Sequence, residues 1–285
     1  MSLDILELKI DGIPSKLMIP EFSTPAQNLK KMYQTRPNYE YEAVMVALLH
    51  KILNALEKPT FADIGPFIGF YTIFAAKVLA ERGQVVAFES NPQYIEALQQ
   101  NLVLNEVNAE VIHAVLSDQV ETLKILGSAV SGQPDADGLA MQSETLDAIC
   151  QRKDLQIDVA KMDVHGFEGK ILGGMPEVLA QMKYLLMELH PNLFLEKFTP
   201  GLTRMRILDM LEEAGFRNYY IAGHRYTWSD GMRKFFETGQ FAYQPLTREN
   251  RGMLLFDRHN HVFVLSSKTP LEDLIGPSIL DPSAE

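Results

Sequence analysis

Cysteine is nearly absent from this chain, since Cys150 is the only one among 285 residues. A lone thiol excludes an intramolecular disulfide framework and any cysteine-rich zinc or iron–sulfur site. No apolar run approaches the roughly 20 residues that a membrane helix needs, so no membrane insertion is expected. The first residues carry neither a basic cluster nor a long apolar stretch, so no secretory signal is expected and the predicted compartment is cytoplasmic.

Positive charge is also scarce. The chain has 26 Lys and Arg residues against 37 Asp and Glu residues, and a net charge of -11. Non-specific binding to nucleic acid needs Lys and Arg to neutralise phosphates, so no nucleic-acid partner is expected. With 46% hydrophobic residues, the chain suits one large domain with an appendage or two modest domains. A homo-oligomer is compatible with the sequence, which does not determine the oligomeric state.

Residues 1–58 are predicted to form an N-terminal cap made of a hairpin and a helix. Residues 3–20 have apolar positions on both sides of the turn signal Asp11-Gly12, which is typical of a β-hairpin. Polar chain containing proline is expected to continue to Pro37. Residues 41–56 then repeat apolar side chains at helical spacing, which predicts an amphipathic helix.

Residues 59–285 are predicted to form a second, larger domain. Predicted strands at 60–64, 84–89, 109–114, 159–162 and 184–188 alternate with predicted helices at 70–80, 93–105, 143–150, 169–181 and 204–214. This alternation predicts a Rossmann-like α/β fold with a doubly wound, mostly parallel sheet. Residues 217–221 and 262–266 are strand-like and predict a final antiparallel pair. The long insertion between them, near 223–260, is predicted to be a lid.

A glycine loop follows the first of these strands, where doubly wound sheets bind their ligands. In this loop Asp63 precedes Gly65 and Gly69. A dinucleotide fingerprint needs a second glycine two positions after the first, so that the backbone can approach a pyrophosphate, and Phe67 stands there instead. The spacing favours a nucleoside ligand without a pyrophosphate, and a purely structural turn is the alternative.

Polar residues close the next two strands. Glu89 ends the second strand 20 residues after the second loop glycine. A carboxylate there can accept hydrogen bonds from both hydroxyls of a ribose, although a solvent-facing side chain is the alternative. Ser90 and Asn91 follow as a helix start. Ser117 and Asp118 close the third strand, and Asp118 is interpreted either as an acceptor for an adenine amino group or as an ordinary turn residue.

Seven short motifs follow one another along the chain. They are Asp63-Ile-Gly65-x-x-x-Gly69-Phe-Tyr71, Phe88-Glu89-Ser-Asn91-Pro92, Leu102-x-x-Asn105, Ser117-Asp118, Thr145-Leu-Asp147, Lys161-Met-Asp163-Val-His-Gly166-Phe-Glu168 and Glu188-Leu-His190-Pro191. Together they resemble the FkbM family of class I methyltransferases, over roughly residues 39–216 and the terminal strand near Phe263. The resemblance implies a seven-stranded sheet with a reversed last strand, S-adenosylmethionine as methyl donor and, typically, O-methylation.

The resemblance also implies roles for single residues. It gives Gly65 and Gly69 to the donor loop, Glu89 to the ribose, and Asp163 to the acid that follows the fourth strand. The region before the glycine strand caps the donor pocket in related enzymes, which adds Tyr41 to the expected donor-binding residues. An exposed helix start is the alternative for this region.

Two departures from the family bear on the chemistry. Pro66-Phe67 stands where Ala-Asn is usual, and His165 stands where Glu is usual. A hydroxyl acceptor must lose its proton as it attacks the methyl group. His165, just past the fourth strand, and His190, after the fifth, are the candidate bases because histidine titrates near neutral pH. Asp163 is expected to organise the amino group of the donor or the acceptor.

The predicted function is therefore an S-adenosylmethionine-dependent methyltransferase that methylates a hydroxyl of a sugar, a polyketide or another small molecule, so the expected partner is a small-molecule or glycan acceptor. An NAD-dependent oxidoreductase and a non-catalytic nucleoside-binding module are the alternatives. Asp163, Glu188 and His190 also have the ligand types of a divalent-ion site. The favoured interpretation is that these three residues are separate polar residues at strand ends, and no metal site is predicted.

Overall fold

The computed structural model describes residues 4–36, 40–126, 129–131, 138–223, 230–256 and 261–279. Its first element is an antiparallel hairpin of β1 (Ile5–Ile10) and β2 (Ile13–Met18). The turn residues Asp11 and Gly12 both have positive φ, as a tight two-residue hairpin turn requires. The predicted N-terminal hairpin is confirmed.

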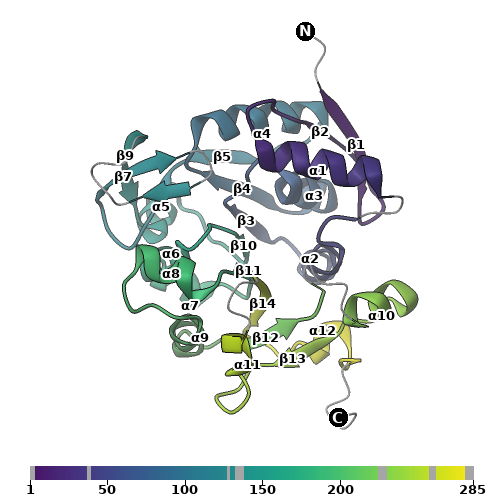
Figure 1. Cartoon of the computed structure of the whole chain (residues 1–285), viewed down its shortest axis with the longest axis vertical. Helices are drawn as coiled ribbons and strands as arrows, with labels where there is room; N and C mark the ends of the chain where they lie inside the picture. The colour runs from purple at the N-terminus through teal and green to yellow at the C-terminus, as the bar shows by residue number, and fades with distance from the viewer. Residues whose placement is uncertain are drawn as a thin grey trace.

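An eight-stranded sheet forms the centre of the molecule, in the order β13-β12-β14-β11-β10-β3-β4-β5 (Figure 1). The strands from β11 to β5 in this order are parallel neighbours, whereas β14 is antiparallel to both β11 and β12. The bounds are β3 (Thr60–Ile64), β4 (Gln84–Glu89), β5 (Glu110–His113), β10 (Val159–Met162), β11 (Tyr184–Leu189), β12 (Arg217–Ile221), β13 (Tyr243–Pro245) and β14 (Val262–Ser267). The Rossmann-like fold with a reversed last strand is confirmed. The predicted seven strands are one too few, because β13 pairs with β12 at the edge.

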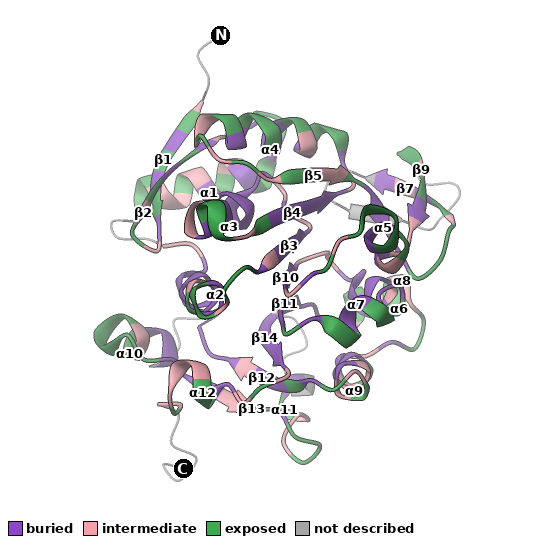
Figure 2. Ribbon diagram, turned by 180° about the vertical axis from the view of Figure 1, so that it is seen from behind, coloured by how far each residue is buried: buried purple, intermediate pink, exposed green. Residues whose placement is uncertain are grey.

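Helices cover both faces of this sheet (Figure 2), since successive side chains of a strand point to opposite faces. On one face, α2 (Ala43–Ala55), α3 (Phe70–Leu79) and α4 (Pro92–Leu104) share a hydrophobic cluster with Phe61 and Leu186. On the other face, α5 (Leu146–Lys153), α6 (Glu168–Gly173), α7 (Pro176–Gln181) and α9 (Arg204–Glu213) share a second cluster with Ile64 and Met187. Between β11 and α9, α8 (Asn192–Phe198) also contributes to this second cluster through Leu195.

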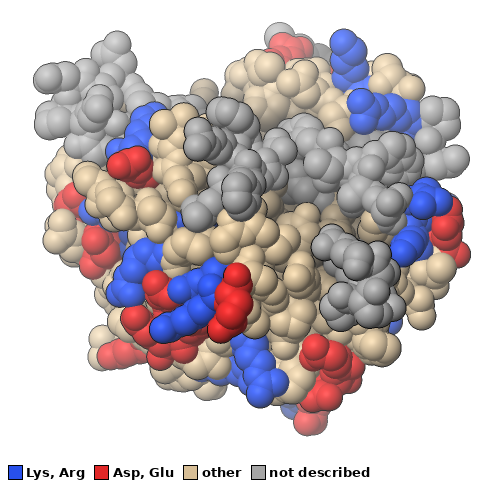
Figure 3. All heavy atoms as spheres, turned by 60° about the horizontal axis from the view of Figure 1, so that its bottom comes forward, with Lys and Arg blue, Asp and Glu red and all other residues tan. Residues whose placement is uncertain are grey.

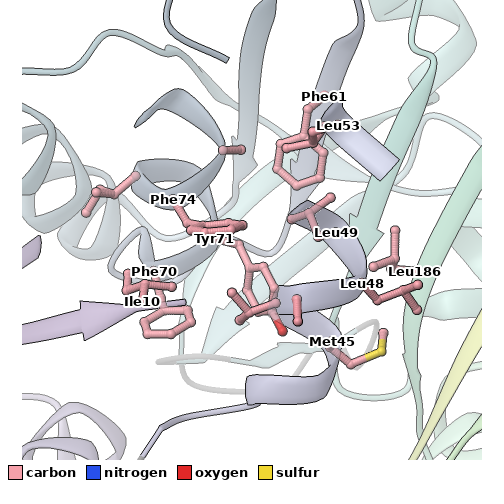
Figure 4. Packing of buried hydrophobic residues seen from close by; sticks show 14 of the residues in the cluster. Ile10, Met45, Leu48, Leu49, Leu53, Phe61, Phe70, Tyr71, Phe74 and Leu186 are labelled. Carbon is pink, nitrogen blue, oxygen red and sulfur yellow. The ribbon is translucent and has the colours of Figure 1, made fainter. Parts of the chain in front are cut away.

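The contact between α2 and α3 attaches the N-terminal cap to the sheet (Figure 4). Leu48, Leu49 and Leu53 of α2 are fully buried, as is Phe74 of α3. Burying an aliphatic side chain of this size contributes about 2 kcal/mol. This contact therefore fixes the start of α2 close to the carboxyl ends of the strands.

A helix occupies residues that were expected to be polar irregular chain. In α1 (Thr24–Thr35), the hydroxyl of Ser23 accepts a hydrogen bond from the backbone N–H of Ala26, and Pro25 lies in the first turn. Proline is tolerated there because the first N–H groups of a helix have no partner within the helix. Ala26 and Leu29 are buried, so the helix packs its apolar residues against the sheet side of the molecule.

A second, small sheet was not predicted. It joins β6 (Val115–Leu116), β9 (Leu139–Glu144), β7 (Thr122–Leu126) and β8 (Ala129–Ser131) in the order β6-β9-β7-β8. The helix expected at 143–150 is wrong at its start, because Ser143 and Glu144 belong to β9. α5 begins only at Leu146, after Thr145 accepts a hydrogen bond from the N–H of Ala148.

The insertion between β12 and β14 contains α10 (Asp230–Thr238), β13 and α11 (Met253–Phe256). Its residues 224–229 and 257–260 lie outside the described part of the chain. The remaining short elements are a 3-10 turn, η1 (Ala80–Arg82), and α12 (Glu272–Ile275). Across the described ranges, every helix is too short or too polar to cross a bilayer.

The same alternation of side chains gathers polar groups at one edge of the sheet. Lys161 in β10 lies opposite Asp63 in β3 and Leu186 in β11, so these side chains share the face covered by α2 and α3. Glu188 follows two residues after Leu186 on the same face. His261 precedes the reversed strand β14, and therefore lies at the edge where the parallel strands end.

Gly65 is required by the packing of two adjacent strand ends. Its φ is +79°, and a Cβ atom built there would lie 2.2 Å from the carbonyl oxygen of Asp163. The loops after β3 and β10 therefore touch through their backbones. Gly12 offers a matched comparison, because its φ is +78° and a Cβ would meet nothing within 4 Å.

We expect Gly65→Ala to lower the free energy of unfolding by about 3 kcal/mol and Gly12→Ala by only about 1 kcal/mol. Both variants bear the strain of an alanine at positive φ, but only the first also overlaps backbone atoms. Urea denaturation of both variants checks the difference. Equal losses of stability would show that the contact between Gly65 and Asp163 is not tight.

Candidate active site

A pocket of about 530 Å³ opens where β3, β4 and β10 end. Its walls are the loops after these strands, residues of α1, the chain just before α2, and His261. This volume suits a small ligand or cofactor. The predicted site residues that line it are Tyr41, Gly65, Glu89, Ser90, Asp163 and His165.

Glu89 is held at one side of the pocket by three backbone N–H groups. Ser90 and Asn91 donate to Oε1 at 2.9 and 2.8 Å, and Phe67 donates to Oε2 at 3.3 Å. Each carboxylate oxygen can accept two hydrogen bonds, so Oε2 keeps capacity for a ligand hydroxyl. Burial raises the pKa of Glu89 to about 7, although the three N–H groups act in the opposite direction.

The glycine loop turns the ring of Phe67 toward Tyr94, with 4.7 Å between the ring centroids. Phe67 has a φ of +57°, which directs its N–H to Glu89. Gly69 begins α3 with a φ of +94°, and a Cβ there would lie 2.3 Å from Cδ1 of Leu98. The second loop glycine is therefore required by helix packing, and it does not line the pocket.

Asp63 and Asn91 lie behind the pocket wall. Asp63 is fully buried and accepts a hydrogen bond from the hydroxyl of Thr72 at 2.6 Å, while its Oδ1 has no hydrogen-bond partner in the described part of the chain. Asn91 accepts a hydrogen bond from the N–H of Gln93 and caps α4. Both residues shape the loops that surround Glu89, and direct contact with the donor stays a prediction for them.

Ser117 and Asp118 are engaged with other side chains outside the pocket lining. The hydroxyl of Ser117 donates to Glu121 at 3.0 Å, and Asp118 pairs with Lys170 at 3.1 Å. Val115 and Leu116, directly before them, line the pocket. An adenine contact by Asp118 therefore stays a prediction.

Glu42 and Tyr71 close the pocket from the helical side. Glu42 is 2% exposed and accepts a hydrogen bond from the Tyr71 hydroxyl at 2.6 Å. Burial raises the pKa of Glu42 well above its usual value, and the nearby Glu188 raises it further. Lys161 Nζ lies 5.0 Å from the centre of the Tyr71 ring and 3.5 Å from Oδ2 of Asp163.

A buried cluster of carboxylates and histidines lies beyond Lys161. His190 is fully buried, and its Nδ1 lies 2.5 Å from Oε1 of Glu168 and 3.1 Å from the carbonyl oxygen of Glu188. Nδ1 of His261 lies 2.5 Å from Oε1 of Glu188. On the opposite side of the His190 ring, Nε2 lies 3.9 Å from Oδ1 of Asp163.

Charges in this cluster shift one another's proton affinity. Burial raises the pKa of Asp163, with a further rise caused by Glu188 and a lowering caused by Lys161. Burial opposes the charged form of His190, but Glu168, Asp163 and Glu188 together raise its pKa to about 8. His190 does not line the pocket, so its predicted role as a base toward an acceptor would have to act through Asp163.

Three of the residues that line the pocket have positive φ without being glycine, namely Glu42, Phe67 and His165. Such conformations cost energy and concentrate where a chain positions functional groups. After His165, Gly166 has a φ of +100°, and a Cβ there would lie 2.6 Å from the carbonyl oxygen of Phe194. This turn brings the His165 ring to 5.1 Å from that of His190.

Several site residues were missed in the sequence or left without a role, among them Glu42, Tyr71, Lys161, Glu168 and His261. One signal for His261 was available, since a reversed last strand must begin at the edge where parallel strands end. For Glu168 the signal was weak, because a helix that follows the fourth strand has many polar first-turn residues. The partners of Lys161 depend on which strands are neighbours, which the sequence does not state.

The pocket fits the nucleoside donor that the sequence predicts. Apolar side chains of Phe88, Val115, Leu116, Phe167 and Ile171 line one part of it. Beside them, the carboxylate of Glu89 is oriented by three N–H groups and retains acceptor capacity on Oε2. An apolar surface next to a fixed acceptor suits a base with its attached ribose.

We expect Glu89→Gln to weaken the binding of S-adenosylhomocysteine by 10- to 100-fold, because hydrogen bonds to a charged group contribute about 1.5–3 kcal/mol. The amide oxygen can still accept from Ser90 and Asn91, so the loop should keep its fold. Isothermal titration at pH 8 measures the change, with Glu96→Gln on the exposed face of α4 as control. Equal affinity in both variants would show that Glu89 does not bind the donor.

The same residue predicts a pH dependence. Glu89 is ionised above about pH 7 and protonated below it, so affinity for S-adenosylhomocysteine should fall as the pH is lowered. Between pH 8 and pH 6 the ionised fraction drops by about tenfold, and the affinity should drop by a similar factor. Titrations across this range test the trend, and the Glu89→Gln variant should show a flatter profile.

Solved structures with a similar arrangement include three methyltransferases or related proteins at low similarity. Precorrin-6y C5,15-methyltransferase from Geobacter metallireducens GS-15 is 15% identical, with a TM-score of 0.41 over 82% of this chain and 93% of that one. Fibrillarin from Aeropyrum pernix, with natively bound S-adenosyl-L-methionine, is 13% identical, with a TM-score of 0.43 over 92% of both chains. The tRNA (uracil-54, C5)-methyltransferase of Pyrococcus abyssi, in complex with S-adenosyl-L-homocysteine, is 16% identical, with a TM-score of 0.44 over 93% of this chain and 44% of that one.

No curated protein matches the chain. The sequence profile of the methyltransferase FkbM domain, in contrast, matches residues 63–218, which are 156 of the 285 residues. The match spans the glycine loop, Glu89, and the loops after β10 and β11. The chain therefore belongs to the FkbM methyltransferase family and uses S-adenosylmethionine as its methyl donor.

Proposed function

We propose that the chain transfers the methyl group of S-adenosylmethionine to a hydroxyl of a small-molecule or glycan acceptor. The observation that supports this most is a group of histidines and carboxylates on the far side of the pocket from Glu89. His165 and His261 both line the pocket there, together with Asp163. An alcohol acceptor needs such a group, because its proton must leave as the carbon–oxygen bond forms.

The donor side and the acceptor side of the pocket lie at different strands of the sheet. Glu89 ends β4, and His261 precedes β14, with β3, β10 and β11 between these strands. Neighbouring strands are about 4.8 Å apart, so the two side chains stand on strands separated by about 19 Å. A nucleoside over β3 and β4 leaves the part of the pocket over β10 and beyond to the acceptor.

When bound, S-adenosylmethionine supplies an electrophilic methyl group on a sulfonium. The chain itself must align the acceptor and receive its proton. His261 is the favoured proton acceptor, because Oε1 of Glu188 lies 2.5 Å from its Nδ1 and would stabilise the imidazolium. His165, the base expected from the sequence, lines the same region, but no carboxylate of the described residues lies within hydrogen-bond distance of its ring.

The net charge of -11 supports a small acceptor over a nucleic acid. Figure 3 shows a face on which acidic and basic side chains of the described residues are intermingled. Nucleic-acid binding uses a one-signed basic surface instead. Membership of a methyltransferase family also sets aside the NAD-dependent oxidoreductase, whereas a module that binds the donor without transfer is left to experiment.

A panel of acceptors tests the proposal. The protein is incubated with radiolabelled S-adenosylmethionine and either hydroxylated small molecules (sugars, nucleotide sugars, phenols and polyketide alcohols), amines, or RNA. Methyl incorporation is expected only with hydroxyl compounds. Transfer confined to amines or RNA, or donor binding without transfer to any member of the panel, would contradict the proposal.

For an acceptor found in this way, His261→Gln should lower kcat by about 100-fold or more, because general-base catalysis contributes about 10²- to 10⁴-fold. Binding of S-adenosylhomocysteine should stay unchanged, since His261 lies on the acceptor side. His50→Gln, at a histidine paired with Asp11 outside the pocket, is the control. An unchanged kcat in His261→Gln would show that another group accepts the proton of the hydroxyl.

A further inference from the structure

Two buried polar atoms face each other without a hydrogen bond at the centre of the histidine–carboxylate cluster. Nε2 of His190 and Oδ1 of Asp163 both lack a partner among the described residues, and they lie 3.9 Å apart. His190 is fully buried. Buried polar groups almost always have a hydrogen-bond partner, so this pair indicates a binding position for a further group or ion.

The contacts of Nδ1, on the other side of the His190 ring, indicate what Nε2 can bind. Nδ1 of His190 meets only acceptors, the carboxylate of Glu168 at 2.5 Å and the carbonyl of Glu188 at 3.1 Å, so it carries a hydrogen. Binding of a metal ion displaces any proton from Nε2, and the ring then presents a lone pair toward a carboxylate oxygen. Either a proton or a metal ion can lie between this nitrogen and the facing oxygen of Asp163.

A third ligand atom converges on the same point. One nitrogen of His165, Nε2 or Nδ1 of His190 and one oxygen of Asp163 all lie within 4.8 Å of one another. A shared proton needs two partners only, whereas a metal ion needs three or more. We propose that Asp163, His165 and His190 bind one divalent transition-metal ion at the acceptor side of the pocket.

Glu168 has the position of the outer residue that orients a metal-binding histidine. Ligating histidines commonly donate their second N–H to a carboxylate, which fixes the tautomer and the plane of the ring. Glu168 is fully buried and makes this contact with His190. An ion about 2.1 Å from each ligand places tetrahedral ligands about 3.4 Å apart, so Asp163 and His190 would approach by about 0.5 Å.

The local charge also favours a cation. Five carboxylates lie in or beside this cluster, and Lys161 is the lysine among them (the acids are Glu42, Asp63, Asp163, Glu168 and Glu188). Lys161 contacts Oδ2 of Asp163, which leaves Oδ1 turned toward His190. A divalent ion would balance part of this excess negative charge.

The ligand types narrow the choice of ion. Two imidazole nitrogens and one carboxylate oxygen suit Zn²⁺, Mn²⁺, Fe²⁺ or Co²⁺, whereas Mg²⁺ and Ca²⁺ prefer oxygen ligands. A second group, Glu188, His190 and His261, shares His190. Glu188 and His261 already contact each other at 2.5 Å, so the group with Asp163 and His165 is favoured.

Asp163 and His165 line the pocket, so an ion between them would be reachable from the acceptor side. Three protein ligands leave positions for oxygens of water or of an acceptor. A bound hydroxyl would lose its proton more easily to His261. The ion site itself does not rest on the proposed function, because the metal can be tested alone.

The experiment uses the purified full chain after EDTA treatment, without donor or acceptor. Titration calorimetry with Zn²⁺ and Mn²⁺ measures stoichiometry and affinity, and the visible absorption of added Co²⁺ reports nitrogen ligation. We expect one ion per chain, at least 100-fold tighter for Zn²⁺ than for Mg²⁺. Absence of binding, or binding of Mg²⁺ as tight as that of Zn²⁺, would overturn the proposal.

Variants assign the ligands. Asp163→Asn and His165→Ala, both at the pocket wall, should weaken Zn²⁺ binding by 10- to 100-fold, and circular dichroism checks their fold. His190→Gln tests the buried ligand, and Glu168→Gln should weaken binding by a smaller factor. His50→Gln should bind Zn²⁺ like the unaltered chain. Unchanged affinity in Asp163→Asn and His165→Ala, or an equal loss in His50→Gln, would overturn the site.

Discussion

The rest of the site depends on the interaction between the buried ammonium of Lys161 and the carboxylates around it. Lys161 is 8% exposed. Burial alone would lower its pKa, but Asp163, Asp63, Glu42 and Glu188 raise the pKa above its usual value. The converse also holds, since Lys161 lowers the pKa of Asp163, Glu42 and Asp63. Removing one member of a buried charge group leaves the others uncompensated, which is strongly destabilising. Acceptor chemistry and fold stability are therefore linked through one side chain.

Much of the fold could be predicted because it follows from periodicity and chain direction. The hairpin around Asp11-Gly12, the parallel strands and the reversed β14 each have a local pattern that one sequence displays. α1 was missed, because its cap at Ser23 and its proline in the first turn resemble irregular chain. The small sheet was missed, because β9 shows no regular alternation of buried and exposed residues and pairs with β7 across a gap in sequence.

The candidate site was predictable only in part, for a different reason. Gly65 and Asp163 directly follow strand ends and Glu89 is the last residue of β4, so their position at the pocket follows from the fold. Ser117 and Asp118 also follow a strand, but the sequence could not show that Lys170 and Glu121 engage them. The roles of Gly65 and Gly69 also depend on tertiary contacts that the sequence does not show, since the absence of a Cβ atom makes room for Asp163 and Leu98.

The contribution of His261 to the pocket comes from the far end of the chain. Glu89 and the glycine loop belong to the first half of the sheet, whereas His261 stands after the insertion that separates β12 from β14. A substitution at His261 can thus change one wall of the pocket while the loops that hold Glu89 keep their sequence. In a fold divided in this way, substitutions late in the chain can vary one wall of the pocket independently of the other.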